Sequence, residues 1–198
     1  MATKKGGGVL KNGAKDALEK MTHEDDAPPL RLFSLKHEFQ TEWYRFLNPL
    51  DPAATSHSLL LDLTRERFPF HVRTKALTLE AMTLFLKMGE DFVYDERNGL
   101  GFHPGPEDQK QSGSANFATV GSPIKDLPFA RADLTSLEIP AKLVLEVPGK
   151  DLPNPDGATP RTWWQSVKTG GANRARLKPS AIADIWIVCR YSVAAKRH

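Results

Sequence analysis

Cysteine is nearly absent from this chain: Cys189 is the single one among 198 residues. One cysteine excludes an internal disulfide and any metal site built from several thiolates. Because Cys189 lies among apolar residues in "AIADIWIVCRYSV", the sequence predicts an inert thiol in the protein core.

Motifs of catalysis and cofactor binding are missing as well. The sequence has no GxSxG elbow, Walker loop or GxGxxG fingerprint, and its six histidines show neither HxH nor HExxH spacing. Asp62, Glu66 and Asp184 could in principle pair for acid–base work, but we interpret them as turn and edge carboxylates paired with Arg65 or Arg67. We therefore predict a protein that is not an enzyme, with no metal and no cofactor.

Long apolar runs and a large excess of one charge are also lacking. No segment could serve as a signal peptide or a transmembrane helix, so we expect a soluble protein. The 27 basic and 24 acidic residues leave a net charge of only +3, which predicts no nucleic-acid partner. A hydrophobic content of 40%, including ten Phe and four Trp, is enough for one sizeable core.

The order of segments predicts a tail followed by one β domain. Residues 1–29 are rich in Gly and Lys and then acidic, and we expect a flexible tail, with binding by a partner left open. Residues 30–198 form the domain. Alternation of apolar and polar residues predicts strands at 31–39, where His37 and Glu38 would point to opposite faces, and at 57–64. One short helix is expected near 41–47, capped by Thr41 and ended by Pro49.

The pattern over 76–87 is ambiguous between strand and helix. Leu77, Leu79 and Ala81 keep one phase, after which Met82, Leu84 and Leu86 occupy the other. A strand that becomes buried on both faces would give this pattern, and so would a bulge. Helical spacing fits in part, and periodicity favours the strand only modestly.

The second half of the chain alternates long Gly- and Pro-rich loops with strands. We expect an excursion over 89–130 with one or two short edge strands, a strand at 139–147, and a loop over 150–180. The last segment, 182–193, is almost continuously apolar and reads as a central strand. Arg190 within it would need a carboxylate, and Asp62 or Glu146 is the expected partner. This sequence of short strands predicts an all-β, antiparallel β-sandwich, jelly-roll-like.

Two features of the 150–180 loop are candidate binding sites. Trp163 and Trp164 are adjacent in a polar context, so they either plug the end of the sandwich or form an exposed anchor for a partner or a sugar. Arg174 and Arg176 alternate with Lys178 in "NRARLK", which is either a solvated edge or a basic docking strip.

Four blocks together resemble a known family: "LFSLKHEFQTEWYRFLNP", "LDLTRERFPFHVRTKALTLEAMTLFLK", "LVLEVPGKDLP" and "AIADIWIVCRYSV". In this order they are similar to the TcB-binding domain at the C-terminus of the A subunits of bacterial Tc insecticidal toxins, over roughly Leu30 to Val193. The resemblance implies a β-sandwich, a strand at 76–87, and a corner at 65–70 in which Pro69 stiffens the turn and both Phe residues close the core.

The resemblance also implies a function. In that family this domain ends a pentameric A subunit and docks the β-propeller of the B subunit, without catalysis of its own. We therefore expect a protein-docking module with a B-subunit-like partner, in a secreted toxin complex or exported from the bacterial cytoplasm by a non-classical route. The alternative is a free-standing lectin-like sandwich or effector that a secretion apparatus carries by its tail and that binds glycans through Trp163 and Trp164.

Overall fold

The computed structural model describes residues 28–51, 54, 57–94, 101–104, 115–124, 127–147, 163–169 and 172–194. The tail predicted for residues 1–29 therefore lies almost wholly outside the described residues. Among the described residues, no helix combines the length and the apolar character needed to cross a bilayer.

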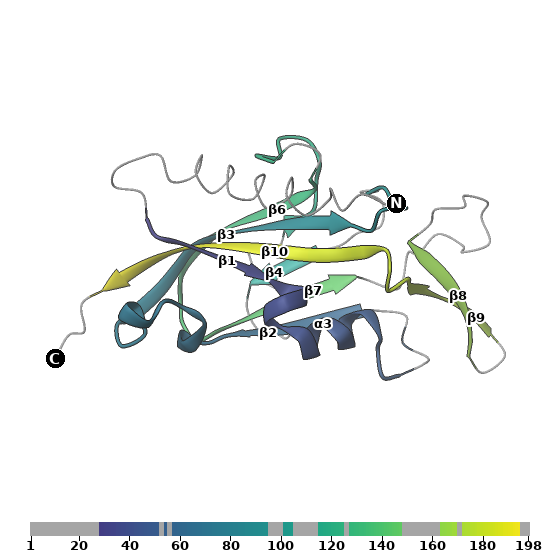
Figure 1. Ribbon diagram of the computed structural model, residues 1–198, viewed down its shortest axis with the longest axis horizontal. Coiled ribbons are helices and arrows are strands. Elements are labelled where there is room, and N and C mark those ends of the chain that lie inside the picture. The colour runs from purple at the N-terminus through teal and green to yellow at the C-terminus, as the bar shows by residue number, and fades with distance from the viewer. Residues whose placement is uncertain are drawn as a thin grey trace, which may run out of the picture.

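Two antiparallel four-stranded sheets form the two layers seen in Figure 1. Sheet A has the order β1-β10-β3-β6, made of Leu30–Ser34, Ile182–Ala194, Ala76–Met88 and Phe129–Glu138. Sheet B has the order β2-β7-β4-β5, made of His57–Leu63, Ala141–Val147, Gly101–Pro104 and Ala115–Asn116. The all-β, antiparallel prediction is confirmed, and so is the central place of β10.

Three smaller features complete the fold. Helices α2 (Leu35–Glu38) and α3 (Gln40–Leu47) follow β1; α2 packs against β10, and α3 lies beside β2 in Figure 1. The 3-10 turns η1 (Arg65–Arg67) and η2 (Phe70–Val72) connect β2 to β3. Strands β8 (Trp164–Thr169) and β9 (Ala172–Leu177) pair into a hairpin at one end of the sandwich.

The core lies between the two sheets because each strand places alternate apolar residues on its inner face. Strand β2 shows this most clearly: its burial alternates at every position, and Leu59, Leu61 and Leu63 are inside. The inner residues of β10 and β7 meet them in one cluster that includes Ile185, Ile187, Cys189, Leu143 and Leu145.

Strand β3 resolves the ambiguity at 76–87. It is a strand over its full length, and both features that could explain the change of phase are present. The register with β10 shifts between the pairs Ala81–Arg190 and Leu79–Tyr191, so a bulge at Glu80 transfers the inward positions from Leu79 to Met82. Residues 81–86 are also buried on both faces.

Strand β1 ends earlier than expected. The strand predicted for 31–39 is wrong beyond Ser34, because the Ser34 hydroxyl accepts a hydrogen bond from the His37 amide at 3.3 Å and caps helix α2. Leu35 and Phe39, four residues apart, suit one face of a helical turn as well as one face of a strand. The helix predicted near 41–47 is confirmed as α3, but the cap predicted at Thr41 is wrong, because the helix begins at Gln40 and its N-cap is Phe39.

Arg190 has a different partner from the two expected. Its Nε lies 3.5 Å from a carboxylate oxygen of Glu80 on the neighbouring strand β3. Asp62 and Glu146 belong to sheet B, whereas Arg190 projects from the face of sheet A opposite to the inward Cys189 and Tyr191. The prediction of Asp62 or Glu146 was wrong because it treated the outer face of β10 as facing the second sheet.

Strands β8 and β9 lie in a segment predicted as a loop, and most of β6 lies at 131–138, to which the sequence pattern assigned no element. The inward residues of β6 are small, Ala130 and Ala132, so the hydrophobic alternation of this strand is weak. The β8–β9 register pairs Thr169 with Ala172, which leaves the sequence Gly-Gly as the connection, a common two-residue hairpin linker. That linker was the available signal for the hairpin.

Candidate functional site

The predicted tryptophan pair lies inside the molecule. Trp163 is 2% exposed and Trp164 is 3% exposed. The Trp163 indole donates to the carbonyl of Val93 at 2.8 Å, and its ring packs against Tyr94 with centroids 5.4 Å apart. Both rings are thus buried, as expected if they plug the end of the sandwich. The indoles offer no face to a partner or a sugar.

The two predicted arginines lie on β9, the second strand of the hairpin. Arg176 is partly buried, and its guanidinium donates to the carbonyl of Pro49 at 3.0 Å. Arg174 pairs with Val167 through the backbone, and its side chain lies outside the described residues. Arg176 therefore attaches the hairpin to the segment after α3, and the structure does not join it to the tryptophans in one exposed surface.

His57 links the same hairpin to the sandwich. Its side chain is fully buried, with Nδ1 2.7 Å from the carbonyl oxygen of Phe46 and Nε2 3.0 Å from the amide nitrogen of Leu177. A carbonyl can only accept and an amide can only donate, so Nδ1 carries the proton and Nε2 is the acceptor. Burial lowers the pKa of His57 below its ordinary 6.5, the Phe46 contact opposes this shift, and the charge of Arg176 adds to it.

This geometry predicts a pH dependence of stability. The unfolded chain protonates His57 near pH 6.5, whereas the folded chain protonates it only at lower pH, so between these values protons favour the unfolded state. The contribution of the neutral ring is complete above about pH 6.5 and falls as the pH falls towards the lowered pKa. Urea unfolding of wild type and His57→Gln over about pH 5–7.5 should show a steeper loss for wild type. The exposed His37 and His71 are present in both chains and cancel. Parallel curves would contradict this role.

The corner between β2 and β3 is a second candidate site, and sequence reasoning misplaced one of its residues. Phe68 is 1% exposed and belongs to the core, as expected. Phe70 is 83% exposed, so the expectation that both Phe residues close the core was wrong for Phe70. The reason is the local backbone: η2 begins at Phe70, and Val72 is the residue of that turn which faces inward. The Pro69 carbonyl accepts from the Val72 amide at 3.0 Å and fixes the turn.

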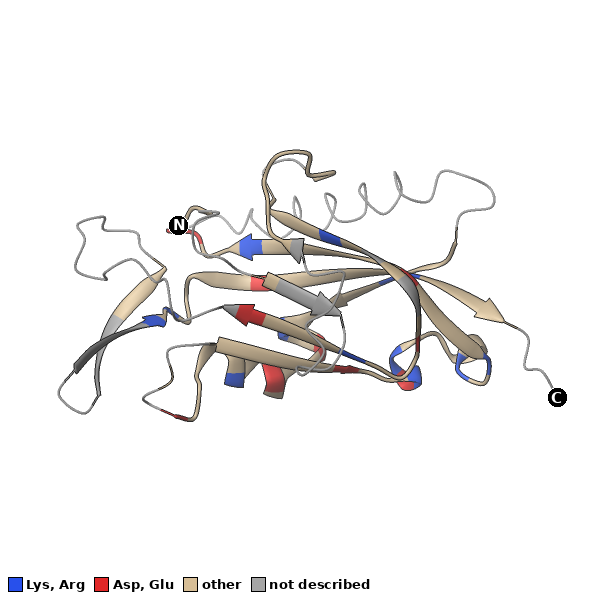
Figure 2. Cartoon of the chain, turned by 180° about the vertical axis from the view of Figure 1, so that it is seen from behind, with Lys and Arg blue, Asp and Glu red and all other residues tan. Residues whose placement is uncertain are grey.

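Positive charge gathers at this corner. Figure 2 shows Lys and Arg in blue over η1 and the turn after η2. Residues 65–75 contain four cationic side chains and a single acidic one, in the sequence "RERFPFHVRTK". Counting formal charges as four minus one gives +3 for this segment, the same as for the whole chain. The corner thus holds a local excess that the overall composition conceals.

A surface pocket of about 530 Å³ opens at the corner. Three arginines (Arg31, Arg67 and Arg73), two glutamates (Glu38 and Glu66) and the Phe68–Pro69 pair line it. The arginines come from β1, from η1 and from the turn before β3, so the pocket forms only when these elements assemble.

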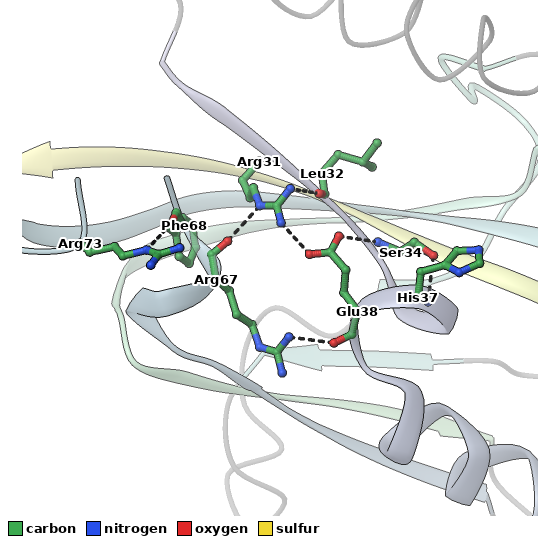
Figure 3. Close-up of polar contacts among 8 residues, drawn as sticks. All are labelled: Arg31, Leu32, Ser34, His37, Glu38, Arg67, Phe68 and Arg73. Carbon is green, nitrogen blue, oxygen red and sulfur yellow. Dashed lines mark hydrogen bonds and ion pairs between the residues drawn. The ribbon is translucent and has the colours of Figure 1, made fainter. Parts of the chain in front are cut away.

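The pocket's side chains are held by an ordered set of hydrogen bonds, shown in Figure 3. Arg31 donates from Nε to the Arg67 carbonyl at 3.0 Å, from Nη1 to the Leu32 carbonyl at 2.8 Å, and forms an ion pair with Glu38 at 2.5 Å. Arg67 donates from Nη1 to the Glu38 carbonyl at 2.8 Å, and its guanidinium lies 3.7 Å from the centre of the Phe39 ring. Each nitrogen of the Arg31 guanidinium thus contacts a group within the chain, and the side chain positions η1 against α2.

Arg67 and Arg73 keep donors for another molecule. Arg73 donates from Nε to the Phe68 carbonyl at 2.8 Å, a contact that uses one of its five N–H groups. The pKa of the exposed Glu66 is lowered, first by hydrogen bonds from its own backbone amide and from Thr64, and further by the charges of Arg73 and Arg65. The corner therefore keeps Glu66 ionised and presents both signs of charge beside Phe70.

Asp184, weighed above as a possible acid–base group, has a structural role in this fold. Its carboxylate is 7% exposed and accepts hydrogen bonds from the Ser34 hydroxyl, the Trp186 indole and the amides of Lys36 and Ile185, at 2.7–3.1 Å. Within the described ranges, no three His, Cys, Asp or Glu side chains lie together as a metal site would require.

Comparisons with protein-family models, with curated proteins and with solved structures find no match to this chain.

Proposed function

We propose that this chain is a non-enzymatic docking module of the Tc-toxin type, which binds a B-subunit-like β-propeller or another component of such a machine. The observation that carries the proposal is the corner at 65–75. Its Arg-Phe-Pro-Phe block is one of the most specific parts of the resemblance, and in the fold it presents Phe70 to solvent on a fixed turn. Exposed aromatic residues flanked by arginines are typical anchors of protein–protein interfaces.

The positions of the four resembling blocks support the same proposal. The first forms β1, α2 and α3, and the second forms the end of β2, the corner and β3. The third contributes to β7 and the last forms β10. Each block thus builds either a neighbouring strand of the sandwich or the corner, which is the placement expected if the resemblance reflects a shared fold.

We also infer a jelly-roll topology from the strand pairing. If the β8–β9 hairpin is set aside, the eight sheet strands pair first with last (β1 with β10), β2 with β7, β3 with β6, and β4 with β5. A long antiparallel ribbon folded over itself produces this order, and jelly rolls have that form. The lectin-like alternative has less support, since its two expected sugar-binding indoles are buried.

Binding to a Tc B–C cocoon tests the docking function. The purified chain, mixed with a cocoon assembled from B and C subunits, should give a complex by size-exclusion chromatography and by biolayer interferometry. An unrelated β-propeller of similar charge serves as the control. Absence of a complex with the cocoon at micromolar concentrations, or equal binding to the control propeller, would contradict the proposal.

A further inference from the structure

We infer that Phe70 and the corner pocket form one docking surface for an acidic segment of a protein partner. In this arrangement carboxylates of the partner pair with Arg67 and Arg73, while an apolar recess of the partner receives the Phe70 ring. The inference rests on the proposed docking function and adds to it the surface used and the chemistry of the partner.

Charge complementarity identifies the sign of the partner. The four cations and one acid of residues 65–75 attract a negatively charged segment, and such attraction mainly accelerates the encounter and fixes orientation. Planar guanidinium groups also match carboxylates in a two-pronged geometry. Among the described residues, Arg67 donates from Nη1 and Arg73 from Nε, so their other N–H groups can form these pairs without breaking a contact that the described part of the fold makes.

Preorganisation makes the surface suitable for tight contact. Arg67 is held by the Glu38 carbonyl and by the face of Phe39, and Arg73 by the Phe68 carbonyl. Side chains that are already ordered lose less conformational entropy when a partner binds. Phe70 is beside the pocket-lining Pro69 in a turn closed by backbone hydrogen bonds, so the backbone that carries its ring is also fixed before binding.

The lining of the pocket favours a protein over a nucleic acid or an anionic membrane. Glu38 and Glu66 lie on the same pocket as the arginines, and both would repel a continuous row of phosphates. A protein segment can place its carboxylates at the arginines and leave neutral or basic groups opposite the glutamates. Because the pocket carries charges of both signs, it favours a partner that places acidic groups at the arginines and other groups opposite the glutamates.

A peptide titration followed by NMR tests the surface without the cocoon. The full chain is titrated with a short peptide of alternating acidic and leucine residues, and separately with the same peptide carrying lysines in place of the acids. We expect chemical-shift changes at the Nε–Hε groups of Arg67 and Arg73 and at the amides of 66–73 with the acidic peptide alone. Equal changes with the lysine peptide, changes centred elsewhere, or no change at millimolar concentration would overturn the inference.

Matched variants separate this surface from a general effect of charge. Phe70→Ala and Arg73→Glu should each weaken binding of the acidic peptide and of the cocoon by about tenfold or more. The controls Tyr44→Ala and Arg45→Glu alter another exposed aromatic and cation, on α3, and should leave binding unchanged. Phe70 is largely exposed, so loss of its ring should not affect folding even if Arg73→Glu does.

Three further measurements identify what binds at the corner and whether the corner is the docking surface. Stronger binding of single-stranded DNA or anionic vesicles than of the acidic peptide at equal salt would overturn the assignment to a protein. If deleting residues 1–27 changes the chemical shifts of the corner, the chain's own acidic run at 24–26 binds there instead. That result also overturns the assignment to a protein partner. If wild type binds the cocoon but Phe70→Ala and Arg73→Glu bind equally well, this surface is wrong while the docking function stands. If the acidic peptide binds at the corner but the chain does not bind the cocoon, this surface stands and the proposed docking function is wrong.

Discussion

Leu61→Ala should lower the free energy of unfolding by about 2–5 kcal/mol, as expected for a large core residue whose site cannot fully collapse. The adjacent Leu60→Ala should cost less than about 1 kcal/mol. The two leucines differ in which face of β2 they occupy: Leu61 is fully buried between the sheets, and Leu60 is 45% exposed on the outer face. Since residue type and strand are the same, the difference isolates burial.

Urea unfolding of both variants, followed by tryptophan fluorescence, measures this contrast. The slope of the transition should be the same in both, so that the shift of the midpoint reports stability. Similar losses for the two variants would mean that β2 is covered on both faces. A larger loss for Leu60→Ala would mean that the register of β2 against β7 is displaced by one residue, because such a slip exchanges the two faces.

Asp184→Ala should cost about 2–4 kcal/mol, the second large effect that we expect. The carboxylate accepts four hydrogen bonds, and its loss leaves partly buried donors of β1, α2 and β10 without an acceptor. Asp184→Asn keeps the size and one carbonyl oxygen but replaces the other oxygen with a group that cannot accept. It should therefore cost about half as much.

The control for Asp184 is Asp62→Asn, which removes an exposed carboxylate from the outer face of β2 and should change stability by less than about 0.5 kcal/mol. Hydrogen exchange adds a local measure. The amides of Lys36 and Ile185 should exchange faster in Asp184→Ala than in the Leu61→Ala variant of comparable stability. If exchange rises equally in both, the carboxylate does not hold α2 to β10.

The elements predicted well from the sequence are those whose own side chains dictate their structure. Strand β2 alternates leucines with polar residues over seven positions, and α3 has a polar start and a proline shortly after its end. Such patterns need no knowledge of the neighbours. In β3 the same reasoning gave two explanations, and the structure contains both: a bulge at Glu80 is followed directly by residues 81–86, which are buried on both faces.

The elements that were missed depend on partners far away in the sequence. Strand β6 carries small inward residues and is defined by its pairing with β3. Helix α2 exists in part because Asp184, almost 150 residues later, accepts from Ser34 and from the Lys36 amide. Local periodicity contains no information about such contacts.

The candidate site shows the same division. Trp163 and Trp164 were recognisable as unusual, but whether they are buried depends on Val93, Tyr94 and His57, which surround them only in the folded chain. Phe70 was expected in the core as part of what the resemblance implied, whereas its exposure depends on the direction of one 3-10 turn. The clustering of arginines from β1, η1 and the turn before β3 was likewise invisible before the fold was known.

The place of β10 in sheet A also determines when this domain can form during synthesis. β10 is the last of the described strands to leave the ribosome, yet it lies between β1 and β3 and pairs with both. Until it emerges, β1 has no strand partner in the sheet, and β3 has only β6. A nascent chain therefore leaves the short β1 and one edge of the 13-residue β3 without a strand partner until β10 is made, and contacts between the first and last described strands close a long loop. Folding of sheet A is for this reason a late, slow event, and the unfinished chain is the form most exposed to aggregation and to chaperones.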